Sequence, residues 1–307
     1  MSGDDKRVAF DFEVDFSNGG GIQGQGFRLD IDGDDIDDAA LAAYIVRDLR
    51  LLMVGAVRIL NKTIIRERHK RAAANAAGAV TTDAPVIVDL AHTIEHGMIT
   101  YRGLPAPIVC DFLSREASRA HYAEGTQFQI GHIAMCSNTG TYVDVPFHRY
   151  ADGEDLADVD VGRLANLPGV VVRVTGMSGR AIDREAFMAS DVAGKAVLVH
   201  TGWAAHWRTD RYFEGHPHLT AAAAQYLVDA GAKLVGIDSL NIDDTSGGER
   251  PVHTILLGAG IPIVEHLRGL EQLPESGFRF TAAPPKVRGM GTFTVRAFAV
   301  VQGASAL

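Results

Sequence analysis

The chain has 307 residues, of which 47% are hydrophobic and 22% are charged, and its formal net charge is −9. This balance is that of a globular protein whose core is large enough to exclude water from an active site. Phosphate binding requires clustered Lys and Arg, so the acidic charge argues against a nucleic-acid partner.

Cysteine usage and the N-terminus predict a cytoplasmic protein. There are two cysteines, Cys110 and Cys136, at no disulfide-like spacing, which is typical of a reduced compartment. The first residues are acidic and contain no apolar stretch of the kind found in a signal peptide. No apolar run approaches the ~18 residues that a membrane span requires, so we expect no membrane partner.

Residues 1–71 are predicted to form a small ββα module. Apolar and polar residues alternate over residues 8–16, which is the period of a half-buried strand. Glycines at 19–21 indicate a turn, and residues 26–31 can return as a second strand. Acidic residues at 34–38 favour the start of a helix.

The apolar stripe of this helix consists of Leu41, Ile45, Leu49 and Leu52. A module of this size buries little apolar surface by itself. We therefore expect the stripe to be exposed on the module and to pack on the rest of the chain or on a neighbouring subunit.

Residues 19–24 also satisfy the pattern G-x-G-x-x-G. A dinucleotide-binding loop must open a helix, so that the pyrophosphate meets the helix N-terminus. The residues that follow are typical of a strand instead. We interpret the glycines as a hairpin turn and expect no dinucleotide cofactor.

Residues 72–85 are of low complexity and small side chains, which predicts a linker. Residues 86–307 then alternate between strand-like and helix-like segments, the pattern of an α/β domain. The expected buried strands are 86–90, 170–174, 196–200 and 234–237, with a helix over 221–230.

The most informative segment is residues 137–150, which read SNTGTYVDVPFHRY. Asp144 and His148 are four residues apart, but Pro146 lies between them. A fixed non-helical bend must therefore present these two side chains. On these residues alone, a structural turn with a hydrogen-bonded Asp remains the alternative to a functional site.

A second segment contains His253 and, twelve residues later, Glu265 in the run IPIVEHL. Together with the first, it resembles the cyclase family of bacterial kynurenine formamidases and isatin hydrolases. The signature of that family is His-x-Gly-Thr-His-x-Asp-x-Pro-x-His, and the residues that match it are Gly140, Thr141, Asp144, Pro146 and His148. Looser matches at 88–92, 201–203 and 235–239 follow in the family's order.

This resemblance implies an α/β domain with a mixed sheet and a homo-oligomer, commonly a dimer or tetramer. It also implies a hydrolase that acts on a small-molecule amide, formamide, lactam or lactone. In the family, the two leading histidines of the signature bind a divalent metal. The Asp then bridges to a second metal held by the later His and Glu.

The chain departs from the signature at Asn138 and Tyr142, which stand where the family has its two leading histidines. Asn and neutral Tyr are poor zinc ligands, so we expect the first metal position to be absent. The expected ligands of one remaining Zn²⁺ or Mn²⁺ are Asp144, His253 and Glu265.

A metal-free site is the competing hypothesis. Asn138 and Tyr142 would then donate hydrogen bonds to a substrate carbonyl. In either case His148 is the expected general acid–base, because an imidazole titrates near neutral pH. A metal-free lyase or ring-closing enzyme and a non-catalytic binding protein of the same fold remain the alternative functions.

Overall fold

The computed structural model describes residues 6–17, 19–31, 33, 35–48, 54–66 and 85–302. It divides the chain into two compact units, Met1–Thr81 and Thr82–Leu307. Apart from Pro85, the predicted linker lies outside the described residues, and so does the module boundary at residue 71. Each unit is described by itself.

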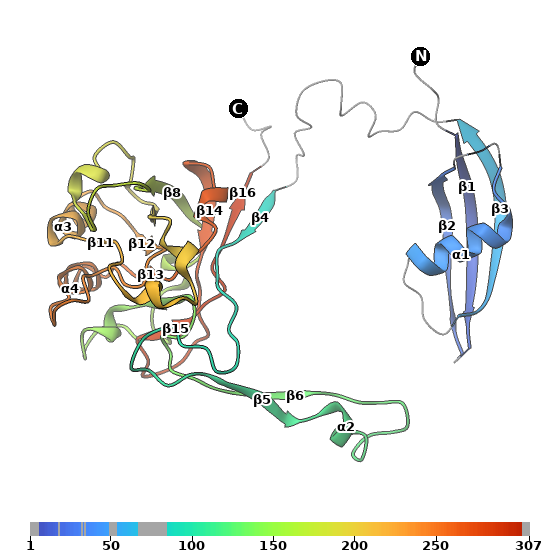
Figure 1. The fold of residues 1–307 in the computed structure, drawn as a ribbon, viewed down its shortest axis with the longest axis horizontal. Coiled ribbons are helices and arrows are strands. Elements are labelled where there is room, and N and C mark those ends of the chain that lie inside the picture. Colours follow the sequence, from blue (N-terminus) through green and yellow to red (C-terminus); the bar gives the residue numbers. More distant parts are fainter. Residues whose placement is uncertain are drawn as a thin grey trace. The chain divides into compact units, whose positions relative to one another are not determined.

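The N-terminal unit is an antiparallel three-stranded sheet with one helix (Figure 1). Its elements are β1 (Lys6–Phe16), β2 (Gly21–Asp30), α1 (Asp38–Asp48) and β3 (Val54–Arg66). The strand order is β2-β1-β3, with β1 in the centre. The predicted hairpin and helix are present, and the structure adds β3, so the order is ββαβ instead of ββα. Gly19 and Gly20, at φ 90° and 79°, form the hairpin turn.

This unit has a hydrophobic core of its own. Alternate residues of β1 point to one face of the sheet and are buried there together with Leu41 and Ile45 of α1. Leu41 is 0% exposed and Ile45 is 2% exposed, so the expectation that the helix stripe is free to dock elsewhere is wrong for both residues. Leu49 and Leu52 lie outside the described residues. The sheet of the same unit covers Leu41 and Ile45.

The second unit is built on a nine-stranded mixed sheet, as expected for its α/β class. Strands β8, β10, β12 and β13 are parallel, and the outer strands pair antiparallel. In spatial order the strands are β15 (Thr292–Thr294), β7 (Tyr142–Asp144), β13 (Ile263–Glu265), β12 (Leu234–Ile237), β10 (Ala196–His200), β8 (Leu167–Arg173), β14 (Ser276–Thr281), β16 (Phe298–Val301) and β4 (Val86–Asp89).

Helices α3 (Ala221–Asp229) and α4 (Pro251–Gly258) lie on the same side of this sheet (Figure 1). Val197 and Val199 of β10 face the core that contains residues of both helices, whereas Leu198 between them faces a second core. The parallel strands are therefore buried on both faces, which explains why they are continuously apolar in the sequence.

A two-stranded arm extends away from the main sheet (Figure 1). It consists of β5 (Ile108–Leu113) and β6 (Ile130–Ala134), with the short helix α2 (Arg115–Ser118) in the connection between them. A small parallel pair is formed by β9 (Ala181–Ile182) and β11 (His218–Leu219). Short 3₁₀ turns are η1 (Pro146–His148), η2 (Val161–Arg163), η3 (Arg184–Ala186), η4 (Trp203–His206), η5 (Asp210–Phe213) and η6 (Leu270–Gln272). Within the described part of the chain, no helix has the length and apolar character needed to span a bilayer.

Candidate active site

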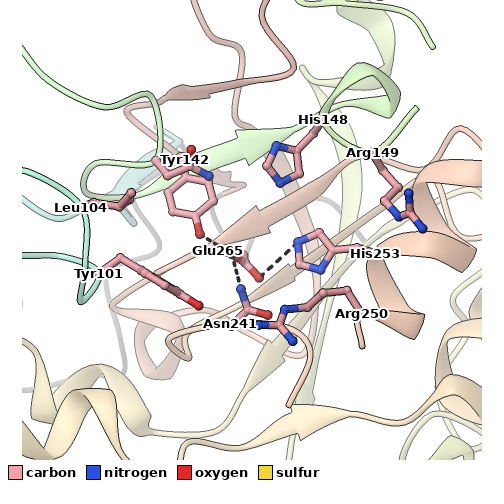
Figure 2. Close-up of a pocket in the computed structure, with 10 residues that line it drawn as sticks. Tyr101, Leu104, Tyr142, His148, Arg149, Asn241, Arg250, His253 and Glu265 are labelled. Carbon is pink, nitrogen blue, oxygen red and sulfur yellow. Dashed lines mark hydrogen bonds and ion pairs between the residues drawn. The ribbon is translucent and has the colours of Figure 1, made fainter. Parts of the chain in front are cut away.

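A cavity of about 290 Å³ opens where β12 and β13 end, at the carboxyl edge of the parallel strands (Figure 2). Ligands of open α/β sheets commonly bind at this edge. The cavity is lined by Tyr101, Leu104, Asn138, Tyr142, His148, Arg149, Asn241, Arg250, His253 and Glu265. Five of the six residues singled out in the sequence are among them, and the sixth, Asp144, is in contact distance of His253.

The motif segment folds as a short strand followed by a tight turn. Strand β7 lies between β13 and β15 and ends at Asp144, which is completely buried. Pro146 then opens the 3₁₀ turn η1, which ends at His148, whose side chain remains 36% exposed. This turn is the non-helical bend that Pro146 predicts.

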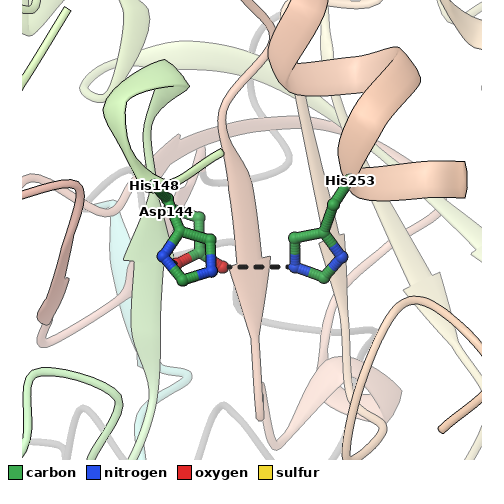
Figure 3. Close-up of side chains that lie close together, drawn as sticks. All are labelled: Asp144, His148 and His253. Carbon is green, nitrogen blue, oxygen red and sulfur yellow. Dashed lines mark ion pairs between the residues drawn. The ribbon is translucent and has the colours of Figure 1, made fainter. Parts of the chain in front are cut away.

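The side chains of Asp144 and His253 point toward each other (Figure 3). Nε2 of His253 lies 3.6 Å from Oδ2 of Asp144. On the other side of the ring, Nδ1 of His253 is 2.7 Å from Oδ2 of Asp243. Asp243 also accepts hydrogen bonds from the backbone N–H groups of Val252 and His253, so it fixes both the start of α4 and the orientation of the imidazole.

The charges around His253 favour its protonated form. Burial alone would lower the pKa of His253, but the nearby Asp144, the hydrogen bond to Asp243 and the charge of Glu265 raise that pKa to about 10. Burial also opposes the charge on Asp144, yet the nearby His148 and His253 hold the pKa of this carboxyl below its ordinary value. Without a metal, the pair is therefore an imidazolium beside a carboxylate.

Glu265 is held by three donors. Its Oε2 accepts hydrogen bonds from the hydroxyl of Tyr142 and from Nδ2 of Asn241, and its Oε1 accepts from the backbone N–H of Ile242 at 2.6 Å. Oε1 also lies 3.8 Å from Nε2 of His253. Burial raises the pKa of Glu265 to about 7, and burial beside Glu265 raises the pKa of Tyr142 well above its ordinary value. Tyr142 is thus a neutral phenol.

Asp144, His148 and His253 offer a donor set for one divalent metal. Oδ2 of Asp144 is buried and has no hydrogen-bond partner among the described residues, as expected of an atom that awaits a ligand. Because Asp243 holds Nδ1 of His253, Nε2 is the nitrogen available to a metal. Ligand atoms about 2.1 Å from a tetrahedral ion lie about 3.4 Å apart, which is close to the distances of Nε2 from Asp144 and Glu265.

His148 belongs to the same cluster. Asp144, His148 and His253 offer ligand atoms that all lie within 4.8 Å of one another. Two of the three ligands expected from the sequence, Asp144 and His253, belong to this group, and Glu265 does not. His148 is the exposed member, and Glu265 already accepts hydrogen bonds on both of its oxygens.

The Cyclase family model, described as "Putative cyclase", matches residues 88–244, just over half of the chain. The chain belongs to the cyclase family. This confirms the resemblance seen in the motif of residues 137–150.

Two relatives that the sequence of this chain matches are kynurenine formamidases. The enzyme of Bacillus cereus is 27% identical over 162 residues, which cover 52% of this chain and 75% of that protein. The enzyme of Geobacillus thermodenitrificans is 29% identical over 178 residues, with coverage of 57% and 82%.

Solved structures of the cyclase fold agree with the mixed sheet. Isatin hydrolase A from Labrenzia aggregata superposes with a TM-score of 0.62 at 21% identity, over 73% of this chain and 96% of that chain. A predicted metal-dependent hydrolase from Bacillus stearothermophilus gives a TM-score of 0.57 at 26% identity, over 71% of this chain and 98% of that chain.

Three residues of this cyclase-family site were not foreseen from the sequence. Asp243 orients His253, Asn241 holds Glu265, and Thr292 contacts both Asp144 and His148. Asp243 and Asn241 follow β12 directly, and polar residues after a buried strand are the signal that could have found them. Thr292 lies 148 residues from Asp144 in the sequence and carries no local motif.

Proposed function

We propose that the protein hydrolyses a small amide, formamide, lactam or lactone at one divalent metal held by Asp144, His253 and Glu265. The observation that carries this proposal is the convergence of Asp144 Oδ2, with no partner among the described residues, and Glu265 Oε1 on His253 Nε2. The kynurenine formamidase relatives support the choice of bond, because a formamidase cleaves a C–N amide bond.

A bound divalent ion supplies polarisation of the substrate carbonyl and acidification of a water molecule. His148 is the proposed acid–base group, because it is the exposed imidazole of the cluster and lies beside the metal site. It removes the proton of the attacking water and returns a proton to the leaving group.

The hydrogen bonds of Asn138 and Tyr142 bear on the roles that we propose for them. The Tyr142 hydroxyl donates a hydrogen bond to Glu265, which supports a role in holding Glu265 in place. Its expected role as a donor to the substrate stays a prediction. Oδ1 of Asn138 accepts a hydrogen bond from Ser137, and the Asn138 side chain also forms a hydrogen bond with Tyr142. Asn138 lines the cavity, and in the proposed mechanism its amide stabilises the developing oxyanion.

The test is turnover of a panel of N-formyl arylamines, cyclic imides, lactams and lactones by chelator-treated protein, with and without added Zn²⁺ or Mn²⁺. We expect hydrolysis of at least one class, dependent on the metal and lost in Asp144→Asn and Glu265→Gln. The matched control is His121→Asn, which changes an exposed histidine of the arm.

The other outcomes decide between the alternatives. Equal turnover with and without metal would establish a metal-free enzyme, and a lyase or ring-closing reaction would show a product of unchanged mass or an eliminated group instead of added water. Binding of panel compounds by the metal-loaded protein without turnover would establish a non-catalytic member. Each of these results overturns the proposal.

A further inference from the structure

Thr292 lies between Asp144 and His148, the proposed metal ligand and the proposed acid–base group of the motif. Its side-chain hydroxyl is in hydrogen-bond contact with Oδ1 of Asp144 and lies 2.7 Å from Nδ1 of His148. The direct distance from His148 Nδ1 to Asp144 Oδ1 is 3.7 Å, too long for a hydrogen bond. Thr292 is 2% exposed, so water does not compete for these contacts.

The direction of both hydrogen bonds follows from counting protons. A hydroxyl has one proton to donate and two lone pairs that accept. The Asp144 carboxylate can only accept, so the Thr292 proton is donated to Asp144. The Thr292 oxygen must then accept from His148, which places the imidazole proton on Nδ1.

The backbone is built to hold this contact. Strand β15 pairs with β7 in a register that sets Thr292 opposite Asp144. The carbonyl of Gly291 accepts a hydrogen bond from the N–H of Val145 at 2.8 Å, which ties β15 to the start of the turn η1. A Cβ atom at position 291 would lie 2.1 Å from the backbone nitrogen of His148, so only glycine permits this approach.

We propose that Thr292 is a positioning residue that fixes His148 as the tautomer with its proton on Nδ1. The ring nitrogen that remains basic is then Nε2. The protonation of one ring nitrogen is set by the hydrogen bond it makes, and here the partner is a hydroxyl anchored by a buried carboxylate. The tautomer follows from geometry alone, whereas its use in catalysis rests on the proposed function.

The first test is independent of activity. Metal-free, chelator-treated full-length protein with ¹⁵N-labelled histidine is studied by NMR at a pH well above the ordinary imidazole pKa. The His148 signals are assigned by their loss in His148→Asn. We expect a protonated-type shift for Nδ1 and an unprotonated-type shift for Nε2 in the native chain and in Thr292→Ser.

In Thr292→Val, Nδ1 loses its acceptor, and we expect the His148 shifts to move toward a tautomer mixture. A native spectrum with the proton on Nε2 would overturn the proposal, and so would a Thr292→Val spectrum identical to the native one. If Thr292→Val fails to fold, the native spectrum and that of Thr292→Ser still decide the question.

The second test uses the substrate class identified by the hydrolysis panel. We expect Thr292→Val to lower kcat by about 10- to 100-fold with little change in KM, because a wrongly protonated base is present but unusable. Thr292→Ser should stay within about threefold of the native kcat, which a role in packing alone would not predict. Equal losses in both variants would overturn the positioning role. An inactive panel would refute the proposed function, while the NMR result would still decide the tautomer.

Discussion

Nε2 of His253 lies 3.6 Å from Oδ2 of Asp144, and on its other side the same ring is held by Asp243 at 2.7 Å. The imidazole thus lies between two carboxylates. Asp243 orients the ring through Nδ1, and Asp144 lies close to Nε2. This arrangement is typical of a histidine that binds a metal through the nitrogen opposite a carboxylate partner.

We predict one equivalent of Zn²⁺ or Mn²⁺ per chain, measured by elemental analysis after metal loading and desalting. One site is expected because Asn138 and Tyr142 replace the imidazoles of the family's other position, and Tyr142 is engaged with Glu265. Asp144→Asn and His253→Asn should each reduce the content to below about 0.1 equivalent, since loss of one ligand or its charge weakens binding strongly. Two equivalents in the native protein would contradict the prediction.

His148→Asn should lower turnover by about 10²- to 10⁴-fold while leaving the fold intact, which is the usual range for loss of a general acid–base group. The measurement is kcat/KM on the active member of the substrate panel, with circular dichroism as the check on folding. His121→Asn is the control, because His121 is exposed on the arm.

His266, next to Glu265 in the sequence, is not a suitable control for His148. Its ring is completely buried, its Nε2 donates to the carbonyl of Leu240 at 2.8 Å, and its backbone has a φ of 57°. A substitution there would test stability instead of chemistry.

Native activity in His148→Asn would remove His148 from the mechanism.

The sequence predicted the central part of the site because that part is local. Asp144, Pro146 and His148 form a strand end and a turn within five residues, and His253 and Glu265 follow at the family's spacing. Thr292 and Asp243 could not be predicted in the same way. Their roles depend on the pairing of β15 with β7 and on the position of α4 relative to β12, which no local pattern encodes.

The same distinction applies to the fold. The buried strands expected at 196–200 and 234–237 are β10 and β12, and the helix expected over 221–230 is α3. In the N-terminal unit, the stripe of Leu41 and Ile45 was recognised, but its partner was not. An apolar helix face has the same sequence whether its own sheet or a second surface covers it, and β3 completes that sheet through long-range pairing with β1.

The buried His266 and the half-buried His92 should each make the protein less stable in acid, an effect opposed by Glu265, whose raised pKa favours proton uptake by the folded state. Burial lowers the pKa of His266 from 6.5 to about 4, and burial with the charge of His266 lowers the pKa of His92 from 6.5 to about 3. Below pH 6.5 the unfolded chain takes up protons that the folded chain does not. The stability contributed by each neutral histidine is therefore complete above 6.5 and is lost toward the folded pKa, by about 1.4 kcal/mol per pH unit.

The free energy of unfolding by denaturant, measured at several pH values between about 6.5 and 4, checks this prediction. The informative variant is His92→Phe. His92 stacks on Trp207 at 3.9 Å, and its Nε2 is buried without a hydrogen-bond partner in the described structure, so phenylalanine keeps the stack and removes the titration. The slope should decrease by about 1.4 kcal/mol per pH unit. An unchanged slope would show that His92 is already protonated or solvated in the folded state.

The arm of β5 and β6 exposes apolar side chains on both of its faces, in residues Ile108, Val109, Phe112, Tyr122, Phe128, Ile130 and Ile133. A two-stranded ribbon is marginally stable in water, and an apolar surface of this kind marks an interaction site. The arm carries Arg115 and Arg119 against Asp111, Glu116 and Glu124, a net charge of −1. Because the whole chain has a net charge of −9, two arms repel each other less than the rest of the two surfaces would. We propose that the arm joins copies of this chain into the expected homo-oligomer.

Phe112 tests this proposal, because its side chain is 76% exposed and its loss removes no contact of the single chain's core. The native protein should have the mass of a dimer or tetramer by light scattering at micromolar concentration, and Phe112→Ser should shift the mass toward the monomer. Met188→Ser is the control, since Met188 is 62% exposed but lies outside the arm, and it should leave the mass unchanged. A monomeric native protein would contradict the proposal outright. If Phe112→Ser leaves the mass of the oligomer unchanged, the contact between copies lies elsewhere. In an isologous contact the substitution removes Phe112 from both partners, so its effect on association is doubled.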